Sequence, residues 1–248
     1  MDNVLLYPIG STKSCRYASD FLKAAGFSLV DHPAPEITHL LLDVPSISQN
    51  GLLADGTDLK ELLRMLPHSI TLIGGKLTAP YCEEYRCLDL LLNPRYLAKN
   101  AAITAECALQ AAAPYLHTTF ADSPALILGW GRIGKCLARL LSALGCSVTV
   151  AARKEQDRAM LEALGYRAVD FQEVPQVLPH CKILFNTVPD LPLSYEVPLG
   201  IAIDLASYPG MNGSNVITAR GLPGKYAPES SGKLIAETIL NHYKEGIL

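Results

Sequence analysis

The chain has 248 residues, of which 49 % are hydrophobic and 18 % charged, and its formal net charge is −3. This length allows one large domain or two modest ones, each with its own core. The balanced charge excludes nucleic-acid binding by phosphate neutralisation, and the lack of any run of 18 apolar residues excludes a predicted membrane helix.

The seven cysteines lie singly in apolar surroundings. Their number is odd and no CxxC pair occurs, so the pattern favours reduced, buried thiols over a disulfide framework or a zinc site. We therefore predict no metal. The first ten residues, MDNVLLYPIG, lead directly into an expected strand and lack a charged leader and a cleavage site. We expect a cytoplasmic location.

The first half of the chain alternates apolar runs with helical patterns, which is typical of an α/β domain with a parallel sheet. The expected strands are residues 4–10, 27–30, 39–44 and 70–73, and the expected helices are residues 14–25 and 58–66. An alanine-rich stretch at 95–113 has high helix propensity and predicts a long connecting helix. We predict a small, open α/β domain over residues 1–118 that includes this helix.

The second half of the chain opens a new βαβ series with ALILGWGRIG at 125–134. Further strands are expected at 148–152, 182–188, 201–206 and 215–219, and a final helix at 228–243. The series predicts a Rossmann domain, a doubly wound parallel sheet, over 119–227. The last segment, 228–248, is expected to return to the first domain, as such helices often do in two-domain dehydrogenases.

The strongest local feature is a GxGxxG motif between an expected strand and an expected helix. Gly129 permits the tight turn, Gly131 lets the backbone approach a pyrophosphate, and Gly134 lets helix and strand pack closely. The helix N-terminus would offer N–H groups and a positive dipole end to the anion. The predicted cofactor contacts here are Gly129, Trp130, Gly131, Arg132, Ile133 and Gly134; a glycine turn without a ligand is the alternative.

The end of the second strand of this series decides the cofactor. An NAD enzyme usually places an Asp or Glu there for the ribose 2′-hydroxyl. Here Arg153 and Lys154 follow the strand, and the first carboxylate is Glu155. A 2′-phosphate would meet two cations, and arginine can bind it with two parallel hydrogen bonds. We predict NADP(H) rather than NAD; the alternative is that both cations are merely solvated loop charges.

Polar residues, Pro and Gly follow the later strands, whose carboxyl ends should face the nicotinamide. We expect rigid loops with exposed N–H groups there, at residues 186–189, 204–210 and 221–225, suited to a cofactor ring and a carboxylate-bearing substrate. Asp204 is either a catalytic acid or a carboxylate that braces its loop. The further predicted cofactor contacts are Asn186, Thr187, Val188, Pro189, Leu205, Ala206, Ser207, Pro223 and Gly224.

Together these motifs resemble the family of dipicolinate synthase A subunits. The stretches that carry the resemblance are LILGWGRIGKCLARLLSALGCSVTVAAR, FNTVP, IDLASYPG and GLPGKYAPESSGKLIAE, within a region from about Asn100 to the C-terminus. Asn100, Thr104 and Glu106 also match the spacing of a family segment that precedes the nucleotide domain. The resemblance implies that Asn100, Thr104 and Glu106 are candidate site residues; an ordinary helix-surface role for Glu106 is the alternative.

The resemblance implies two α/β domains with a cleft between them, and a sporulation enzyme that oxidises dihydrodipicolinate with NADP⁺ to dipicolinate. It also implies a small dicarboxylate substrate and, within a homo- or hetero-oligomer, a partner that is a flavoprotein-like B subunit. Hydride transfer would need a group that accepts one proton. Glu106 is the first candidate for this base and Asp204 the second.

The chain departs from the family pattern mainly in its first half. The segment 9–14 replaces a glycine-rich family segment, Tyr208 stands where an arginine is expected, and Glu229 stands where a basic residue is expected. These departures leave two alternatives open, namely another NADP-dependent dehydrogenase on a small carboxylate (shikimate- or 2-hydroxyacid-like) or a non-catalytic nucleotide-binding partner. The cations that remain for a dicarboxylate are Lys13, Arg95, Lys99 and Lys225.

Overall fold

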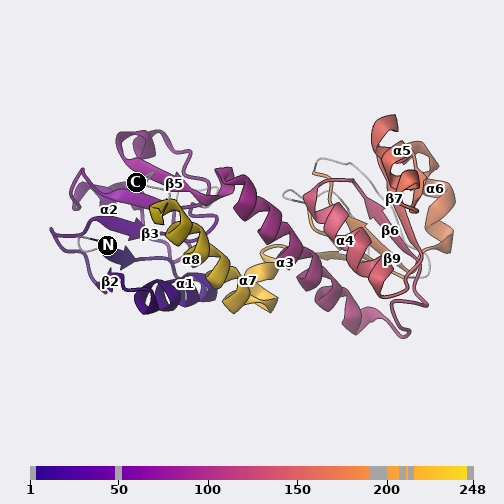
Figure 1. The fold of residues 1–248 in the computed structure, drawn as a ribbon, viewed down its shortest axis with the longest axis horizontal. Helices are drawn as coiled ribbons and strands as arrows, with labels where there is room; N and C mark the ends of the chain where they lie inside the picture. Colours follow the sequence, from indigo (N-terminus) through magenta and orange to yellow (C-terminus); the bar gives the residue numbers. More distant parts are fainter. Residues whose placement is uncertain (1–3, 48–51, 190–199, 207–210, 212–214, 245–248) are drawn as a thin grey trace. The chain divides into compact units, whose positions relative to one another are not determined.

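A computed structural model describes residues 4–47, 52–189, 200–206, 211 and 215–244 of the chain. The chain forms two compact units, residues 1–100 with 223–248 and residues 101–222. Each unit is built on its own parallel sheet (Figure 1). The predicted fold class, two α/β domains of which the second is a Rossmann domain, is confirmed.

The first unit has a five-stranded sheet in the order β2-β1-β3-β4-β5, and every pair is parallel. Its strands are β1 (Leu5–Pro8), β2 (Ser28–Leu29), β3 (His39–Leu41), β4 (Thr71–Gly74) and β5 (Arg86–Asp89). Its helices are α1 (Lys13–Ala24), α2 (Leu59–Arg64), α7 (Leu222–Tyr226), which begins one residue before the unit's second segment, and α8 (Pro228–Lys244). Buried leucines of β3, α2 and β4, with Ile37 and Ile70 just before β3 and β4, form its core.

The final helix, α8, packs against α1, as predicted (Figure 1). Gly232 makes the close approach possible, because a Cβ there would lie 2.5 Å from the Cβ of Tyr17 and 2.6 Å from the carbonyl oxygen of Ser14. The side chain of Thr12 caps α1 by accepting from the N–H of Cys15. Helix α8 is therefore an integral part of the first unit.

A partly buried hydrogen-bond network joins the end of α8 to the sheet. The hydroxyl of Thr38 donates to the carbonyl of Leu5 and accepts from the N–H of Leu5, so it is an acceptor for His39 Nδ1. His39 Nε2 then accepts the hydroxyl proton of Tyr243, at 2.6 Å. Burial lowers the pKa of His39 to about 4, which keeps the ring in this neutral form.

The second unit has a six-stranded parallel sheet in the order β11-β10-β9-β6-β7-β8. Its strands are β6 (Ala125–Leu128), β7 (Val148–Ala151), β8 (Arg167–Val169), β9 (Ile183–Asn186), β10 (Ile201–Asp204) and β11 (Val216–Thr218). Counted from β6 this is the order 3-2-1-4-5-6 of dinucleotide-binding sheets, and the strand order reverses between β6 and β9. Helices α4 (Arg132–Ala143), α5 (Glu155–Ala163) and α6 (Val174–Val177) complete the unit.

The connecting helix α3 (Pro94–Ala112) agrees with the predicted range 95–113. The unit boundaries differ from the proposed domain limits, since the first boundary falls inside α3, after Asn100 rather than after residue 118. The second unit ends at Leu222, five residues before the proposed limit. None of the helices in the described residues is long and apolar enough to span a bilayer.

Strands β5 and β8 and helices α5, α6 and α7 escape the sequence prediction. Strands β5 and β8 lie at sheet edges, and each has a single fully buried residue, so neither shows an apolar run. Helix α5 is mostly polar, with Leu161 as its buried residue. The expected loop from Gly221 to Lys225 is wrong, because α7 begins directly after Gly221, whose φ of +60° suits glycine.

Candidate functional site

The glycine motif forms a tight turn between β6 and α4, at the point where the strand order reverses. Gly129 has a φ of +100°, and a Cβ there would lie 2.7 Å from Thr187 Oγ1. Gly134 faces this turn, because a Cβ would lie 2.2 Å from the carbonyl oxygen of Gly129. Both positions therefore exclude a side chain, as the spacing indicates.

Gly131 differs from these two glycines because nothing lies within 4 Å of the place where its Cβ would be. It is the N-cap of α4, so it provides no side chain to cap the first N–H groups of that helix. A cavity of about 470 Å³ lies here, lined by Gly131, Arg132, Ile133, Lys135 and Thr187. The N–H groups at this helix N-terminus are open, and Arg132 and Lys135 line the same cavity. This arrangement fits the pyrophosphate of a dinucleotide.

The end of β9 closes the other side of this cavity. The backbone N–H and hydroxyl of Thr187 both donate to the carbonyl oxygen of Leu128, at 3.0 and 2.8 Å. Val188, which is partly buried, and Pro189, which is exposed, follow Thr187. Thr187 thus ties the ends of β9 and β6 together and lines the cavity with its side chain.

Asn186 and Asp204 form a fully buried pair at the ends of β9 and β10. Asn186 Nδ2 donates to Asp204 Oδ1 at 2.9 Å, while Asn186 Oδ1 accepts from the N–H of Val188. Asp204 Oδ1 also accepts from the N–H of Ala206, at 3.2 Å. Asp204 therefore braces its loop, which was one of its two expected roles. The side chain of Asn186 takes part in the same hydrogen bonds at the strand end and does not line the cavity.

Arg153 and Lys154 are exposed at the end of β7, as expected of groups that would bind a 2′-phosphate. The backbone that presents them is held by Arg158 from the first half of α5. Arg158 Nη1 donates to the carbonyl oxygens of Ala152 and Arg153, at 2.8 and 2.9 Å. It also pairs with Asp170 Oδ2 at 2.8 Å. Arg158 was not among the predicted site residues, because its partners are backbone carbonyls and a carboxylate that the sequence alone does not bring together.

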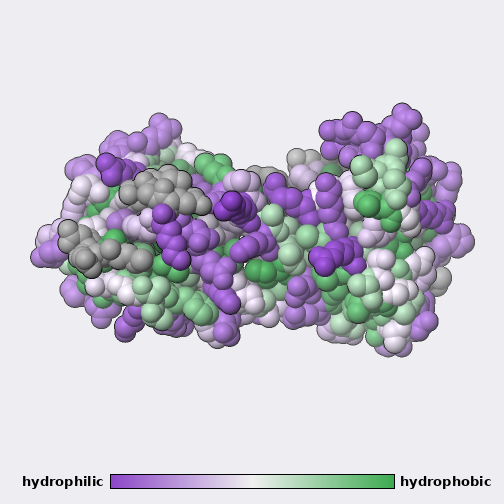
Figure 2. Space-filling view, in the orientation of Figure 1, coloured by the Kyte–Doolittle hydropathy of each residue, from purple (hydrophilic) through white to green (hydrophobic). Residues whose placement is uncertain are grey.

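Trp130 points away from the cavity that Gly131 lines. Its ring centroid lies 6.1 Å from that of Tyr166, and Lys135 Nζ lies 5.7 Å from the Trp130 ring centroid. Met160 of α5 and Leu164, which follows that helix, line the same hollow and are 55 % and 58 % exposed. Figure 2 shows apolar surface on this part of the second unit. The Trp130 ring therefore lies beside Tyr166, which connects α5 to β8.

Asn100, Thr104 and Glu106 all lie on α3, but they do not share one face. Asn100 and Thr104 are four residues apart and project in similar directions, whereas Glu106 projects about 200° around the axis from Thr104. Glu106 is exposed, and the other two are partly buried. The structure therefore separates the predicted base from its two neighbours in the motif.

The remaining predicted positions divide between the units. Leu205 and Ala206 are buried at the end of β10, while Ser207 and Tyr208 lie outside the described residues. Pro223 and Gly224 lie in α7 and belong to the first unit, so they are not in the loop that was expected. A Cβ on Gly224 would lie 3.7 Å from Ser14 Oγ.

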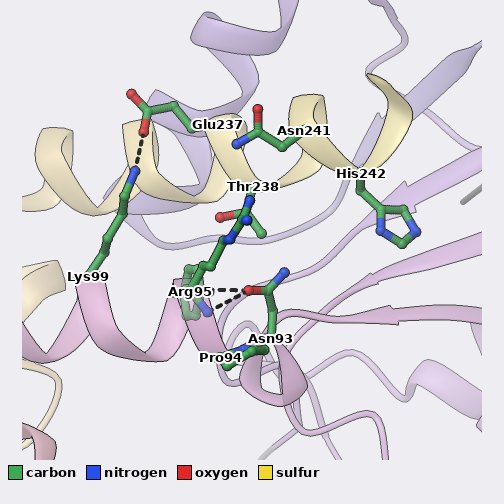
Figure 3. A pocket seen from close by; sticks show the side chains of 9 residues that line it. Asn93, Pro94, Arg95, Lys99, Glu237, Thr238, Asn241 and His242 are labelled. Atoms are coloured by element: carbon green, nitrogen blue, oxygen red, sulfur yellow. Dashed lines mark hydrogen bonds and ion pairs between the residues drawn. The ribbon is translucent and has the colours of Figure 1, made fainter. Parts of the chain in front are cut away.

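Four cations were considered for a dicarboxylate, and all of them lie in the first unit. Lys13 is exposed at the start of α1, and Lys225 lies in α7. Arg95 and Lys99 line a cavity of about 440 Å³ between α3 and α8 (Figure 3). There Lys99 Nζ pairs with Glu237 Oε2 at 3.3 Å, so its charge is already neutralised.

Comparisons with known proteins agree with this geometry. Residues 94–197 match the family model of the D-isomer specific 2-hydroxyacid dehydrogenase, NAD binding domain. The A subunit of dipicolinate synthase from Bacillus subtilis (strain 168) is 30 % identical over 153 residues, which are 56 % of this chain and 52 % of that protein. The match thus spans about half the length of that relative.

Two solved structures share the fold over nearly the whole chain. The dipicolinate synthase A subunit from Bacillus halodurans has a TM-score of 0.82 at 21 % identity, covering 96 % of this chain and 97 % of that one. The A chain of dipicolinate synthase from Bacillus subtilis has a TM-score of 0.80 at 22 % identity, covering 99 % and 97 %. The predicted resemblance is confirmed. These findings support a nicotinamide dinucleotide-binding domain of the dehydrogenase type over residues 94–197.

Proposed function

We propose that the chain is an NADP(H)-dependent oxidoreductase like the A subunits of dipicolinate synthase. Its substrate is dihydrodipicolinate, which gives up a hydride to NADP⁺ and one proton to a base, and the products are dipicolinate and NADPH. A second subunit, corresponding to the B subunit that the resemblance implies, is its expected partner. The observation that carries the proposal is the open turn at Gly131, with Arg153 and Lys154 exposed at the end of β7.

The choice of NADP rests on charge at the end of β7. The strand ends in Ala151, and Ala152, Arg153 and Lys154 follow. The carboxylate of Asp170, at the end of the adjacent strand β8, is held by Arg158 and by the N–H of Gln172. A 2′-phosphate bound at Arg153 would therefore not face an unpaired carboxylate from Asp170.

The chain's own residues supply binding and orientation, while the bound cofactor supplies the hydride acceptor. The N–H groups at the start of α4 bind the pyrophosphate, and the Asn186–Asp204 pair fixes the strand ends beneath the nicotinamide half. Glu106 is the proposed base, because Asp204 is buried and its carboxylate already accepts two hydrogen bonds.

A second function, oxidation or reduction of another small carboxylate such as a 2-hydroxyacid, is favoured by the match of residues 94–197 to the 2-hydroxyacid dehydrogenase domain. The test is to give dihydrodipicolinate and NADP⁺ to the purified chain, with and without a B-type partner. Formation of NADPH and dipicolinate in equal amounts supports the proposal. Turnover of another carboxylate alone supports the second function, and NADPH binding without any turnover contradicts both.

A further inference from the structure

Arg220 lies at the carboxyl edge of the second sheet, two residues after β11. Strand β11 pairs with β10 so that Thr218 lies opposite Asp204, and the N–H of Ala219 donates to the carbonyl oxygen of Asp204. The strands β9, β10 and β11 form the half of such a sheet that holds the nicotinamide end of a dinucleotide. Arg220 therefore stands on the edge where the reacting substrate must approach the cofactor.

The guanidinium group of Arg220 has donors without acceptors. Nη1 and Nη2 are both buried, and neither has a hydrogen-bond partner among the described residues, although 31 % of the side chain is exposed. Nη2 lies 3.6 Å from Asp204 Oδ2, which is an ion-pair distance but too long for a hydrogen bond. A buried donor without a hydrogen-bond partner costs free energy of folding. The stability of the fold therefore does not explain why these donors are unpaired, whereas a role in binding does.

Asp204 orients this guanidinium without using its N–H groups. Its Oδ1 atom accepts from Asn186 and Ala206, so the carboxylate is fixed by β9 and β10. Its charge keeps Arg220 at the strand edge, while two parallel donors on Nη1 and Nη2 are left for another acceptor. A planar fork of two donors matches a carboxylate in shape and charge.

We propose that Arg220 binds a carboxylate of the substrate through Nη1 and Nη2, and that the Asn186–Asp204 pair holds it in position. This assignment rests on the proposed function for the identity of the carboxylate, because dihydrodipicolinate carries two such groups. It also supplies a cation for the substrate in the second unit, whereas the four cations considered from the sequence all lie in the first.

The test uses dipicolinate as the probe, titrated into the full chain with and without NADP⁺, and a separate titration of NADPH. The variants are Arg220→Lys, which keeps the charge beside Asp204 but removes the fork, and Arg220→Gln, which removes both. Arg167→Lys is the matched control, since Arg167 is an exposed arginine of β8 in the same unit. Thermal unfolding of each variant shows whether it is folded.

The proposal expects both Arg220 variants to lose at least tenfold in dipicolinate affinity while NADPH affinity stays within twofold of the wild type. The control should change neither affinity. Equal dipicolinate affinity in wild type and Arg220→Lys, or no dipicolinate binding by the wild type, overturns the assignment. A parallel loss of NADPH affinity also overturns it, since Arg220 would then contact the cofactor. If the wild type binds dipicolinate through Arg220 but no NADPH, the proposed function fails and this assignment stands.

Discussion

Replacing Gly131 with alanine adds one methyl group at the place proposed for the pyrophosphate. In the free protein this methyl group meets no atom within 4 Å, and the φ of −79° is one that alanine adopts readily. The variant should therefore fold with a stability close to that of the wild type. In the complex, the methyl group would keep the phosphate away from the N–H groups at the start of α4.

The size of the effect follows from the contacts that are lost. A hydrogen bond to a charged group contributes about 1.5–3 kcal/mol, so the loss of one such bond weakens NADPH binding by about 10- to 150-fold. Gly134→Ala is the contrasting variant, because its Cβ would lie 2.2 Å from the carbonyl oxygen of Gly129. Such overpacking costs about 1–3 kcal/mol, so this variant should lose stability even without cofactor.

The assay combines thermal unfolding with titration of NADPH by its fluorescence. We expect Gly131→Ala to keep its Tm and lose NADPH affinity, and Gly134→Ala to unfold at a lower temperature. Unchanged NADPH affinity in a folded Gly131→Ala variant would refute the reasoning, because the cofactor could not then lie against this turn.

Three further predictions concern charged and titratable groups. Arg153→Ala should weaken NADPH binding about tenfold or more and leave NADH binding unchanged, as measured by paired titrations, because only NADPH carries the 2′-phosphate. Arg158→Gln should lower the free energy of unfolding by about 1–2 kcal/mol in urea titrations, because the carbonyls of Ala152 and Arg153 lose their donor. Stability should fall as the pH drops from about 6.5 to about 4, because the unfolded chain then protonates His39 while the folded chain, with the His39 pKa lowered to about 4, does not.

Each of these has its own control. Arg167→Ala removes an exposed arginine elsewhere in the second unit and should leave the preference for NADPH over NADH intact. If this variant loses as much NADPH affinity as Arg153→Ala, the loss comes from the net charge of the protein and not from a contact with the 2′-phosphate. For the Arg158 brace, an unfolding free energy equal to that of the wild type would show that the three hydrogen bonds do not form. In the pH series, His39→Gln should show a smaller fall in stability than the wild type, and an identical fall would exclude His39 as its source.

The fold could be predicted where buried residues form an unbroken apolar run in the sequence. Strands such as β6 and β9 are buried along their whole length, so they read as unbroken apolar runs. The edge strands β5 and β8 have mixed surroundings and no such run, which is why they were missed. Helix α7 is too short for a periodic pattern, and its Pro and Gly residues are typical of loops.

The candidate site was predictable where neighbours in space are also neighbours in sequence. The three glycines lie between the end of β6 and the first turn of α4, and Arg153 lies two residues after β7, so their spacing in the sequence places them. The roles of Asn186, Arg158 and Arg220 depend on partners 5 to 18 residues away in the sequence, on other strands or loops. Such contacts exist only after the sheet is assembled, and a single sequence carries no signal for them.

The central claim is that NADP(H) lies across the second sheet where the strand order reverses, with its pyrophosphate at Gly131 and its 2′-phosphate at Arg153. A crystal structure of the chain grown with excess NADPH tests this most directly. We expect density for the pyrophosphate against the first N–H groups of α4, and the 2′-phosphate within hydrogen-bonding distance of the Arg153 guanidinium. A cofactor bound elsewhere, or an empty turn at saturating NADPH, would contradict the account.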